Sequence, residues 1–321
     1  MRILRRRVHH RGVILILLSN GRIIDYVTAS GALAFDGSGW PHTRYLLGPL
    51  KFHDSSLFTV TLKTLTREPR RGNGYTKVLP LNQHGAVLSF WDFLFSPNKI
   101  AGFVNSVGLK NPGIDRATGK YPRMIKKSGL KVIGSLYADD LNDLVYMANK
   151  FNDWPLVALE LNASCPNIPQ RSREENSAFI IESARILAES SNHPLILKLS
   201  FDDDYLFIAK TLAKDNFIEA ISMNSIKYST VFPGLDSPFS HIGGGGVSGK
   251  LSRDYYYIMA KNIMNETDIS LILPVWSEEC IENWLLLSTI NDHDISLSFG
   301  SVFIRWPWWP TAFIKRNGKD L

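Results

Sequence analysis

Residues 156–167 read LVALELNASCPN, an apolar run that ends abruptly in polar residues. Leu156–Leu161 has the nearly continuous apolar composition of a strand that is buried on both faces of a parallel sheet. Two asparagines, Asn162 and Asn167, follow it, together with Cys165, one of two cysteines in the chain. A buried strand that ends in amide and thiol groups predicts a site at its carboxyl end, where α/β barrels carry their catalytic residues.

Seven more apolar, β-rich runs lie along the 321 residues. They are Ile24–Ala29, Leu57–Leu62, Lys131–Leu136, Leu195–Leu199, Ile218–Met223, Ile269–Val275 and Ile295–Phe299. Between most of them lie series with helical spacing, three of which begin at Leu141, at Tyr205, and at Ile281 after the capping residue Ser277. Strands that alternate with helices predict parallel pairing. We therefore expect an α/β fold, a closed (β/α)8 TIM barrel, rather than its alternative, a doubly wound open sheet.

The N-terminal segment is strongly basic. Five arginines among the first eleven residues account for most of the net charge of +6, so the remainder of the chain is close to neutral. No basic face with interleaved aromatic residues is left for nucleic acid, which we exclude as a partner. Val13–Leu18 is too short to span a membrane, and the Asn20-Gly21 pair after it predicts a β-hairpin with a type I′ turn. The alternative for this segment is a targeting or membrane-tethering role.

The domain organisation is expected to be simple. We predict a basic segment and hairpin at residues 1–22 and a single barrel domain at residues 23–321, because no linker or internal repeat interrupts the pattern. Two cysteines cannot form a disulfide framework, which indicates a reducing compartment, the cytoplasm. Two connections, residues 64–130 and 225–249, are too long for simple turns. Such loops are usually functional, and on a barrel those that follow strands lie on the catalytic face.

Polar residues stand at or near the carboxyl ends of six predicted strands: Ser30, Lys63, Ser135, Asn162, Lys198 and Asn224. In a barrel these ends converge on one rim. Lysine is almost never fully buried without a partner, so Lys63 and Lys198 together indicate an anionic or electron-rich ligand. The alternative is that each lysine extends to solvent on its own.

Two glycine-containing segments have the composition of phosphate-binding turns. Gly243–Gly249 can direct backbone N–H groups at an anion, although a flexible hinge is an equal alternative. Gly300-Ser301 follows the last predicted strand, at the position where barrels commonly bind phosphate.

The two cysteines have different surroundings. Cys280 lies in an amphipathic helical pattern near Trp284 and is expected to be a small buried apolar residue. Cys165 lies between Ser164 and Pro166 in a polar segment, which favours a positioned thiol at the rim. Cys165 has no acidic neighbour in the sequence and no local Cys–His signature, so the pattern does not indicate a hydrolytic nucleophile. We also expect no metal site.

Five segments of the chain occur in an order that is typical of one enzyme family. They are Lys63–Asn73, Asn105–Gly113, Asn162–Asn167, Asn224-Ser225 and Gly246–Gly249. The first three resemble the lysine-bearing segment, the substrate loop and the active-site loop of the dihydroorotate dehydrogenases, the FMN enzymes of pyrimidine synthesis, and the last two resemble later signatures. The likeness extends from about residue 22 to 304, and it implies an FMN-containing (β/α)8 barrel with an N-terminal hairpin below it.

The resemblance implies oxidation of (S)-dihydroorotate to orotate in de novo pyrimidine (UMP) biosynthesis. Cys165 would be the general base that takes the C5 proton, and FMN would accept the C6 hydride. The residues assigned in this way to the substrate are Lys63, Asn105, Val107, Gly108, Leu109, Asn162, Asn167, Asn224 and Ser225. Those assigned to FMN are Ser30, Gly31, Lys63, Asn162, Lys198, Asn224, Ser248, Gly249, Gly300 and Ser301.

Cysteine at the position of the base is typical of the soluble class 1 branch of this family. We therefore expect dihydroorotate and orotate as ligands, a homodimer, no membrane contact, and a small soluble electron acceptor such as fumarate. A partner subunit or a quinone is the alternative acceptor. The chain encodes neither an NAD-binding domain nor an iron–sulfur cysteine cluster.

Two features depart from the family pattern. Where family members carry a glycine pair after the seventh strand for the FMN phosphate, this chain has Leu273–Trp276, and its Pro274 lacks an N–H donor. Residues 75–101 form an enlarged insertion with Phe90 and Trp91, which would be a lid, a dimer contact or simple packing. Two alternative functions remain: a related FMN oxidoreductase of another dihydropyrimidine, or an inactive barrel that acts as a flavin-free binding protein.

Overall fold

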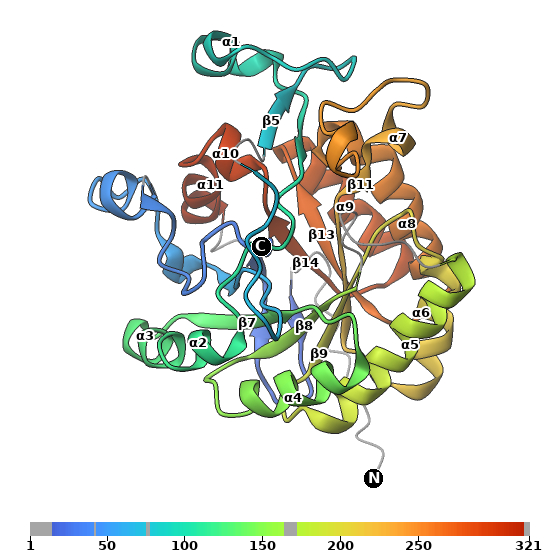
Figure 1. Ribbon diagram of the computed structural model, residues 1–321. Coiled ribbons are helices and arrows are strands. Elements are labelled where there is room, and N and C mark those ends of the chain that lie inside the picture. The colour runs from blue at the N-terminus through green and yellow to red at the C-terminus, as the bar shows by residue number, and fades with distance from the viewer. Residues whose placement is uncertain (1–14, 42, 75–77, 164–171, 318–321) are drawn as a thin grey trace.

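The structure of the protein is a computed structural model that describes residues 15–41, 43–74, 78–163 and 172–317. Eight parallel strands form a closed barrel whose order around the ring is β3-β4-β7-β8-β9-β10-β13-β14 (Figure 1). The strands are β3 (Tyr26–Thr28), β4 (Thr59–Thr61), β7 (Lys131–Leu136), β8 (Ala158–Asn162), β9 (Leu195–Leu199), β10 (Ala220–Met223), β13 (Ser270–Val275) and β14 (Ile295–Phe299). Each lies within, or one residue beyond, one of the eight predicted runs, so the predicted TIM barrel is confirmed and the open sheet is excluded.

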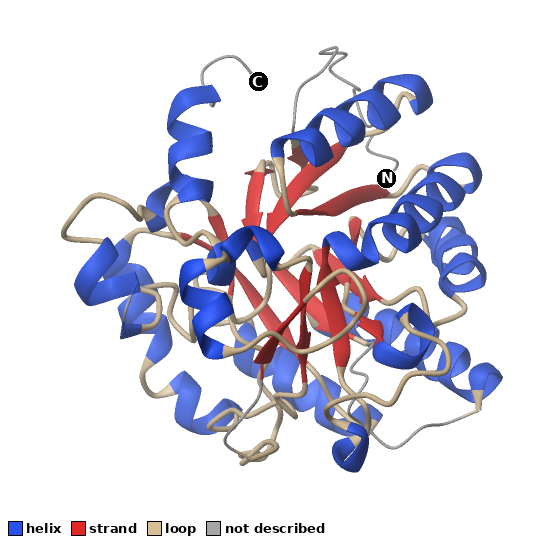
Figure 2. Cartoon of the chain, turned by 90° about the horizontal axis from the view of Figure 1, so that it is seen from above, coloured by secondary structure: helices blue, strands red, loops and turns tan. Residues whose placement is uncertain are grey.

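Helices surround the barrel, as the view from above shows (Figure 2). They are α2 (Ile114–Thr118), α3 (Tyr121–Ser128), α4 (Leu141–Phe151), α5 (Arg173–Ser190), α6 (Tyr205–Asp215), α8 (Arg253–Glu266), α9 (Glu278–Asn291), α10 (Val302–Arg305) and α11 (Trp309–Asn317). The three helices expected at Leu141, Tyr205 and Ile281 are confirmed as α4, α6 and α9. Ser277 caps α9 as predicted, because its side chain accepts a hydrogen bond from the backbone N–H of Cys280. None of the described helices is long and apolar enough to cross a membrane.

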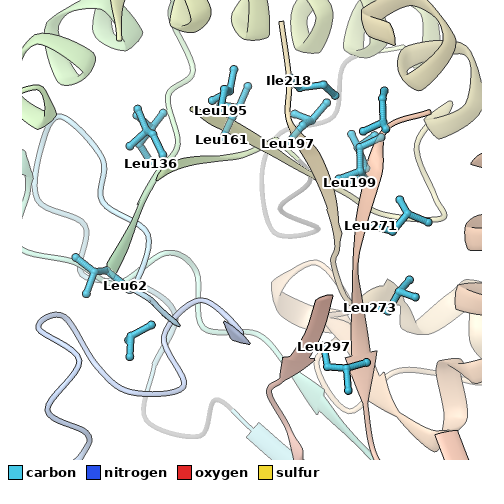
Figure 3. Packing of buried hydrophobic residues seen from close by; sticks show 14 of the residues in the cluster. Leu62, Leu136, Leu161, Leu195, Leu197, Leu199, Ile218, Leu271, Leu273 and Leu297 are labelled. Atoms are coloured by element: carbon cyan, nitrogen blue, oxygen red, sulfur yellow. The ribbon is translucent and has the colours of Figure 1, made fainter. Parts of the chain in front are cut away.

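The side chains of the barrel strands alternate between two environments. Leucines on the outer face, such as Leu161, Leu195 and Leu197, pack against the helices in the main hydrophobic core (Figure 3). Inward-facing residues at the amino ends of the strands form a separate apolar layer: Val27, Ile133, Ala158, Ile196, Ala220 and Ile272. The barrel is therefore a packed structure with an apolar floor and not a pore.

The N-terminal hairpin closes this floor. β1 (Ile16–Leu17) pairs antiparallel with β2 (Ile23–Ile24), and Ile16, Leu18 and Ile24 complete the inner apolar layer. The hairpin is further tied to the barrel by the side chain of Asn20, which donates to the carbonyl of Val157 at 3.0 Å. The predicted hairpin is thus confirmed, and it extends beyond residue 22. The division into residues 1–22 and 23–321 stays a prediction, and the five arginines lie outside the described residues.

The turn of the hairpin differs from the predicted type I′ turn. Gly21 has a positive φ of 76°, whereas Asn20 does not. The N–H of Gly21 donates to the carbonyl of Leu18 at 2.9 Å, and the N–H of Leu18 donates to Arg22 at 2.8 Å. These bonds define a three-residue loop, in which a type I turn is followed by a bulged glycine. Because the loop has three residues and not two, Gly21 alone takes the left-handed conformation, and Asn20 does not need to.

The two long connections predicted to be functional combine into one sheet. It contains β5 (Val78–Leu81) and β6 (Gly102–Asn105) from the first connection, and β11 (Ile226–Lys227) and β12 (Gly246–Gly249) from the second, in the order β11-β12-β6-β5. All of its pairings are antiparallel. A small core of Leu81, Val104, Tyr228, Phe239 and Val247 holds it together.

The aromatic insertion contains a short helix, α1 (Phe90–Phe95), which lies at the periphery at the top of Figure 1. Phe90, Trp91 and Phe95 are 67%, 66% and 74% exposed. Packing within the described part of the chain therefore does not account for these side chains. A lid or a dimer contact remains as the interpretation of this segment.

The role of the hairpin in closing the barrel floor can be tested by shortening one side chain on its buried face and one on its exposed face. Ile16→Ala is expected to lower the free energy of unfolding by about 2–4 kcal/mol, because Ile16 is 1% exposed and its loss leaves a cavity in the floor. Leu17→Ala is the matched control, since Leu17 is 51% exposed and should cost about 0.5 kcal/mol or less. Urea denaturation of both variants measures the difference in the free energy of unfolding. Equal urea midpoints for the two variants would contradict the role of the hairpin in closing the barrel floor.

Candidate functional site

A cavity of about 880 Å³ opens at the carboxyl ends of the barrel strands. The strand ends form its floor, and residues of the four-stranded sheet, such as Phe103 and Ser248, form part of its wall. A second, much smaller cavity of about 10 Å³ lies inside the barrel, and Lys198 lines both. The fold therefore places a large recess where the sequence predicts a site.

The cavity is lined by nearly all of the candidate site residues. They are Ser30, Gly31, Lys63, Asn105, Val107, Gly108, Leu109, Asn162, Lys198, Asn224, Ser225, Ser248, Gly249, Gly300 and Ser301. Cys165 and Asn167 lie outside the described residues, so their predicted roles rest on the sequence alone. Ser135 does not line the cavity but lies directly below it, 0% exposed. Strand ends that are up to 270 residues apart in the sequence thus contribute to one site.

The two lysines occupy different positions. Lys198 is 8% exposed at the end of β9, so it does not extend freely to solvent, whereas Lys63 is half-buried after β4. Gly31 has a φ of 81°, and a Cβ at this position would lie 3.5 Å from Cγ of Lys63. The backbone turn after β3 therefore packs against the stem of Lys63 and helps to fix its course through the cavity wall.

The side chains of Asn162 and Asn224 are held by hydrogen bonds. Nδ2 of Asn162 donates to Oγ1 of Thr64 at 2.9 Å, and Nδ2 of Asn224 lies 3.5 Å from Oδ1 of Asn162. Oδ1 of Asn224 accepts from the backbone N–H of Ser225 at 2.9 Å. Both amides are therefore fixed at the cavity floor and can present donors and acceptors to a planar polar ring.

The loop after β6 is fixed by two other asparagines. Asn111 accepts from the N–H of Gly113 at 2.8 Å and donates to the carbonyl of Leu109 at 2.7 Å. The N–H of Asn73 donates to Val107 at 3.2 Å. Gly108 has a φ of 66°, and a Cβ there would lie 2.6 Å from Oδ1 of Asn73, so only glycine fits. The loop is thereby held in a tight turn in the cavity wall.

The corner of the cavity beside β13 and β14 is aromatic. Trp276, which follows β13, lines the cavity with its ring centroid 6.4 Å from that of Tyr256 and 6.2 Å from that of Trp284. Burial raises the pKa of Tyr256, so its phenol stays neutral. Nε1 of Trp284 donates to the carbonyl of Pro274 at 2.9 Å. This chain has Leu273–Trp276 where family members carry a glycine pair, and Trp276 therefore places an indole ring in the cavity wall.

Charge is distributed unevenly around the cavity. The cationic residues that line it in the described chain are Lys63, Arg70, Lys110 and Lys198, and none of them belongs to β13, β14 or the turns after them. The first turn of α9 carries Glu278 and Glu279, and its N-terminal N–H is capped by Ser277. Acidic residues in a first helical turn oppose anion binding there, so the start of α9 is unfavourable for a phosphate.

Cys280 is confirmed as a buried structural residue. It is 2% exposed in α9, and its Sγ lies 3.4 Å from the carbonyl oxygen of Pro274, to which it donates. Burial raises the pKa of its thiol to about 12, which keeps it protonated and unreactive near neutral pH.

Residues that the sequence did not single out also contribute to the cavity. Thr64 is 4% exposed and bonded to Asn162, and Arg70, Trp40 and Tyr256 line the wall. Thr64 follows Lys63 directly, so its place at a strand end was the available signal. Arg70 lies within the family-like segment Lys63–Asn73, whereas Trp40 and Tyr256 come from a loop and a helix whose distance from the strand ends cannot be read from local pattern.

Comparison with known proteins is consistent with this geometry. The sequence profile of the family described as dihydroorotate dehydrogenase matches residues 94–273, more than half of the chain. A protein of Fusobacterium nucleatum named dihydroorotate dehydrogenase B (NAD(+)), catalytic subunit, is 26% identical over 224 residues, which cover 68% of this chain and 67% of that protein. Its namesake in Geobacillus kaustophilus is 24% identical over 69% of this chain and 67% of its own length.

A third relative of the same name, from Thermoplasma acidophilum, is 31% identical over 149 residues, which cover 46% of this chain and 49% of that protein. The chain therefore spans between about half and two thirds of the length of these relatives.

Proposed function

The chain belongs to the dihydroorotate dehydrogenase family, and on that premise we propose that it oxidises (S)-dihydroorotate to orotate in de novo pyrimidine (UMP) biosynthesis, with FMN as the hydride acceptor. One observation carries the proposal. Fifteen residues that the family resemblance assigns to substrate or cofactor, from Ser30 to Ser301, line a single cavity of about 880 Å³. The segments that resemble the family thus contribute to one recess.

The strand ends support a flavin ring as the occupant. Lys198 is a buried cation at the floor, where it can stabilise negative charge on an electron-rich ring. Two of the lining residues must be glycine because of the protein's own packing: a Cβ on Gly249 would lie 3.0 Å from Cα of Gly102, and one on Gly300 would lie 3.0 Å from Cβ of Ala29. When bound, FMN supplies the acceptor for the hydride.

The amide-rich part of the cavity supports a pyrimidine as the substrate. Asn105, Asn162 and Asn224 line it together, and amides match a ring with alternating N–H and C=O groups. We assign the substrate carboxylate to the backbone of Val107–Leu109, whose turn is fixed by Asn73 and Asn111. Lys63 and Ser225 complete this part of the site, and Asn167 joins it on sequence grounds.

Cys165 is proposed as the general base on sequence grounds. It lies three residues after Asn162 in the sequence, and Asn162 lines the cavity. A thiolate can take the C5 proton near neutral pH if a neighbouring cation lowers its pKa. Cys280 does not compete for this role, because it is buried in α9 and its own pKa is raised.

Two other functions remain as alternatives. Oxidation of a dihydropyrimidine without a carboxylate would leave the fixed turn at Val107–Leu109 without a role. A flavin-free binding protein is favoured only by Trp276 and Pro274 at the phosphate corner. A flavin spectrum of the purified protein separates this second alternative from the proposal.

The first prediction concerns the cofactor and the base. The purified protein should bind FMN, and anaerobic dihydroorotate should bleach it, whereas dihydrouracil should not. Cys165→Ala should keep FMN and slow this reduction by about 10²–10⁴-fold, the usual contribution of a positioned general base. Cys280→Ala is the control that should leave the rate unchanged. Stopped-flow absorbance measures all three proteins, and an unaffected rate in Cys165→Ala would refute its role.

The phosphate corner generates a second prediction. Because Trp276 and the acidic first turn of α9 stand where barrels commonly bind phosphate, we expect the dissociation constants of FMN and riboflavin to differ by no more than about tenfold, the value of one good hydrogen bond. Trp276→Gly should widen the FMN preference by about tenfold, and Trp91→Gly, on the exposed helix α1, should not. Fluorescence titration of the apoprotein gives the ratios; a strong FMN preference in the parent would contradict the expectation.

The electron acceptor is proposed to be a small soluble oxidant, with fumarate as the first candidate, in a cytoplasmic homodimer. The relatives' names, which specify NAD(+) and a catalytic subunit, favour a partner subunit as the second candidate. Steady-state rates with fumarate, NAD(+) and a soluble quinone should be highest with fumarate. Turnover with NAD(+) only after addition of a second protein would support the partner subunit, and a clear preference for quinone would refute both.

A further inference from the structure

Glu160 is a buried carboxylate in the barrel interior that the proposed reaction does not use. It lies on β8, two residues before Asn162, and is 4% exposed. Oε1 accepts from Oγ of Ser135 at 2.9 Å, and Oε2 accepts from Oγ of Ser222 at 3.1 Å. Glu160 and Lys198 both line the small interior cavity.

A continuous chain of hydrogen bonds joins this carboxylate to the cavity floor. It runs from Glu160 to Ser135, then to Oγ1 of Thr64 at 2.9 Å, and then to Nδ2 of Asn162 at 2.9 Å. The four side chains come from three neighbouring strands or strand ends, β4, β7 and β8. Register explains their proximity, because Ser135 pairs with Glu160 across β7 and β8.

The chemistry of the groups sets the direction of the bonds in this chain, to which Ser30 is also joined: its Oγ donates to the carbonyl of Leu62 at 2.8 Å and lies 3.0 Å from Oγ1 of Thr64. A carboxylate can only accept hydrogen bonds, so Ser135 donates its single hydroxyl proton to Glu160. The oxygen of Ser135 can then only accept, as can that of Ser30, so Thr64 donates its one hydroxyl proton to one of these two oxygens. The oxygen of Thr64 is left as an acceptor, and Asn162 must therefore turn its NH₂ group, not its carbonyl, toward Thr64. The amide orientation of Asn162 thus follows from a charge two residues away.

We propose that Glu160 is a positioning residue that sets, through Ser135 and Thr64, which side of the Asn162 amide faces the bound ring. Oδ1 of Asn162 is thereby directed toward Nδ2 of Asn224, whose own orientation is fixed by the N–H of Ser225. The two amides then present one defined pattern of donors and acceptors. Its effect on ligand binding rests on the proposed function, whereas the amide orientation itself does not.

Two serines on the same carboxylate provide the test and its control. Ser135→Ala removes the link between Thr64 and Glu160 while leaving Glu160 in place, and Ser30 is then the remaining acceptor for Thr64. Ser222→Ala removes an equally buried hydroxyl from the other carboxylate oxygen without touching the chain. Ser135→Ala is expected to weaken orotate binding by about tenfold, the value of one well-placed hydrogen bond. Ser222→Ala should stay within about twofold of the parent, although both variants lose a similar amount of stability.

Double variants distinguish a loss of amide orientation at Asn162 from a simple loss of packing, because substitutions in one hydrogen-bond chain do not have additive effects on orotate binding. Thr64→Val should weaken orotate binding as Ser135→Ala does, and the double variant should be no weaker than either single one, because both break one chain. Thr64→Val and Ser222→Ala should instead combine additively. Glu160→Gln keeps an acceptor for Ser135, so it should retain orotate binding better than Glu160→Leu. Isothermal titration calorimetry gives these dissociation constants, and thermal unfolding verifies that each variant folds.

A measurement without ligand keeps this inference separate from the proposed function. The side-chain NH₂ protons of Asn162, assigned by their loss in Asn162→Asp, should exchange slowly with solvent in the parent and in Ser222→Ala, but faster in Ser135→Ala. Equal exchange and equal orotate affinity in the two serine variants would overturn the positioning role. If the parent binds no orotate while the exchange difference is present, the proposed function fails and the orientation by Glu160 stands.

Discussion

Closure of an eight-stranded barrel imposes one constraint on everything else in this protein: the interior must be filled, layer by layer, by the side chains that point inward. At the amino ends of the strands the filling is apolar, and Ile16, Leu18 and Ile24 of the hairpin complete it. Next along the strands come Glu160, Lys198, Ser135 and Ser222, which are charged or polar and nearly free of solvent. The cavity opens above them. Charge is therefore placed directly beneath the site by the alternation of inward and outward residues.

The buried polar layer can orient the side chains above it through hydrogen bonds, which an apolar layer could not do. A polar group inside a protein is costly unless its hydrogen bonds are made, and a network with all its bonds made holds its members in one orientation. Glu160 provides the fixed acceptor from which the directions of the other bonds follow. The asparagine at the end of β8 is thus oriented by β8 itself, by β7 beside it and by Thr64 after β4.

The wall of the cavity depends on contacts between parts of the chain that are remote in sequence. β6 and β12 pair antiparallel although more than a hundred residues separate them, and β5 and β11 extend the sheet on either side. This sheet carries Asn105 and Ser248 to the cavity and leads into the turn at Val107–Leu109. By contrast, the corner at β13 and β14 combines Trp276 and Tyr256 with an acidic helix start, so the cations of the cavity lie away from it.

The sequence by itself determined the eight barrel strands, the cap of α9, the presence of the hairpin and the residues at the strand ends, because each depends on local periodicity or on a side chain a few residues away. Only the tertiary structure decided the sheet built by the two long connections, since its strands are short and their partners are distant. Glu160 was hidden within an apolar run: that it faces inward, between Ser135 and Ser222, follows from the register of neighbouring strands. Register is set by the closed barrel as a whole, and no local stretch of sequence contains it.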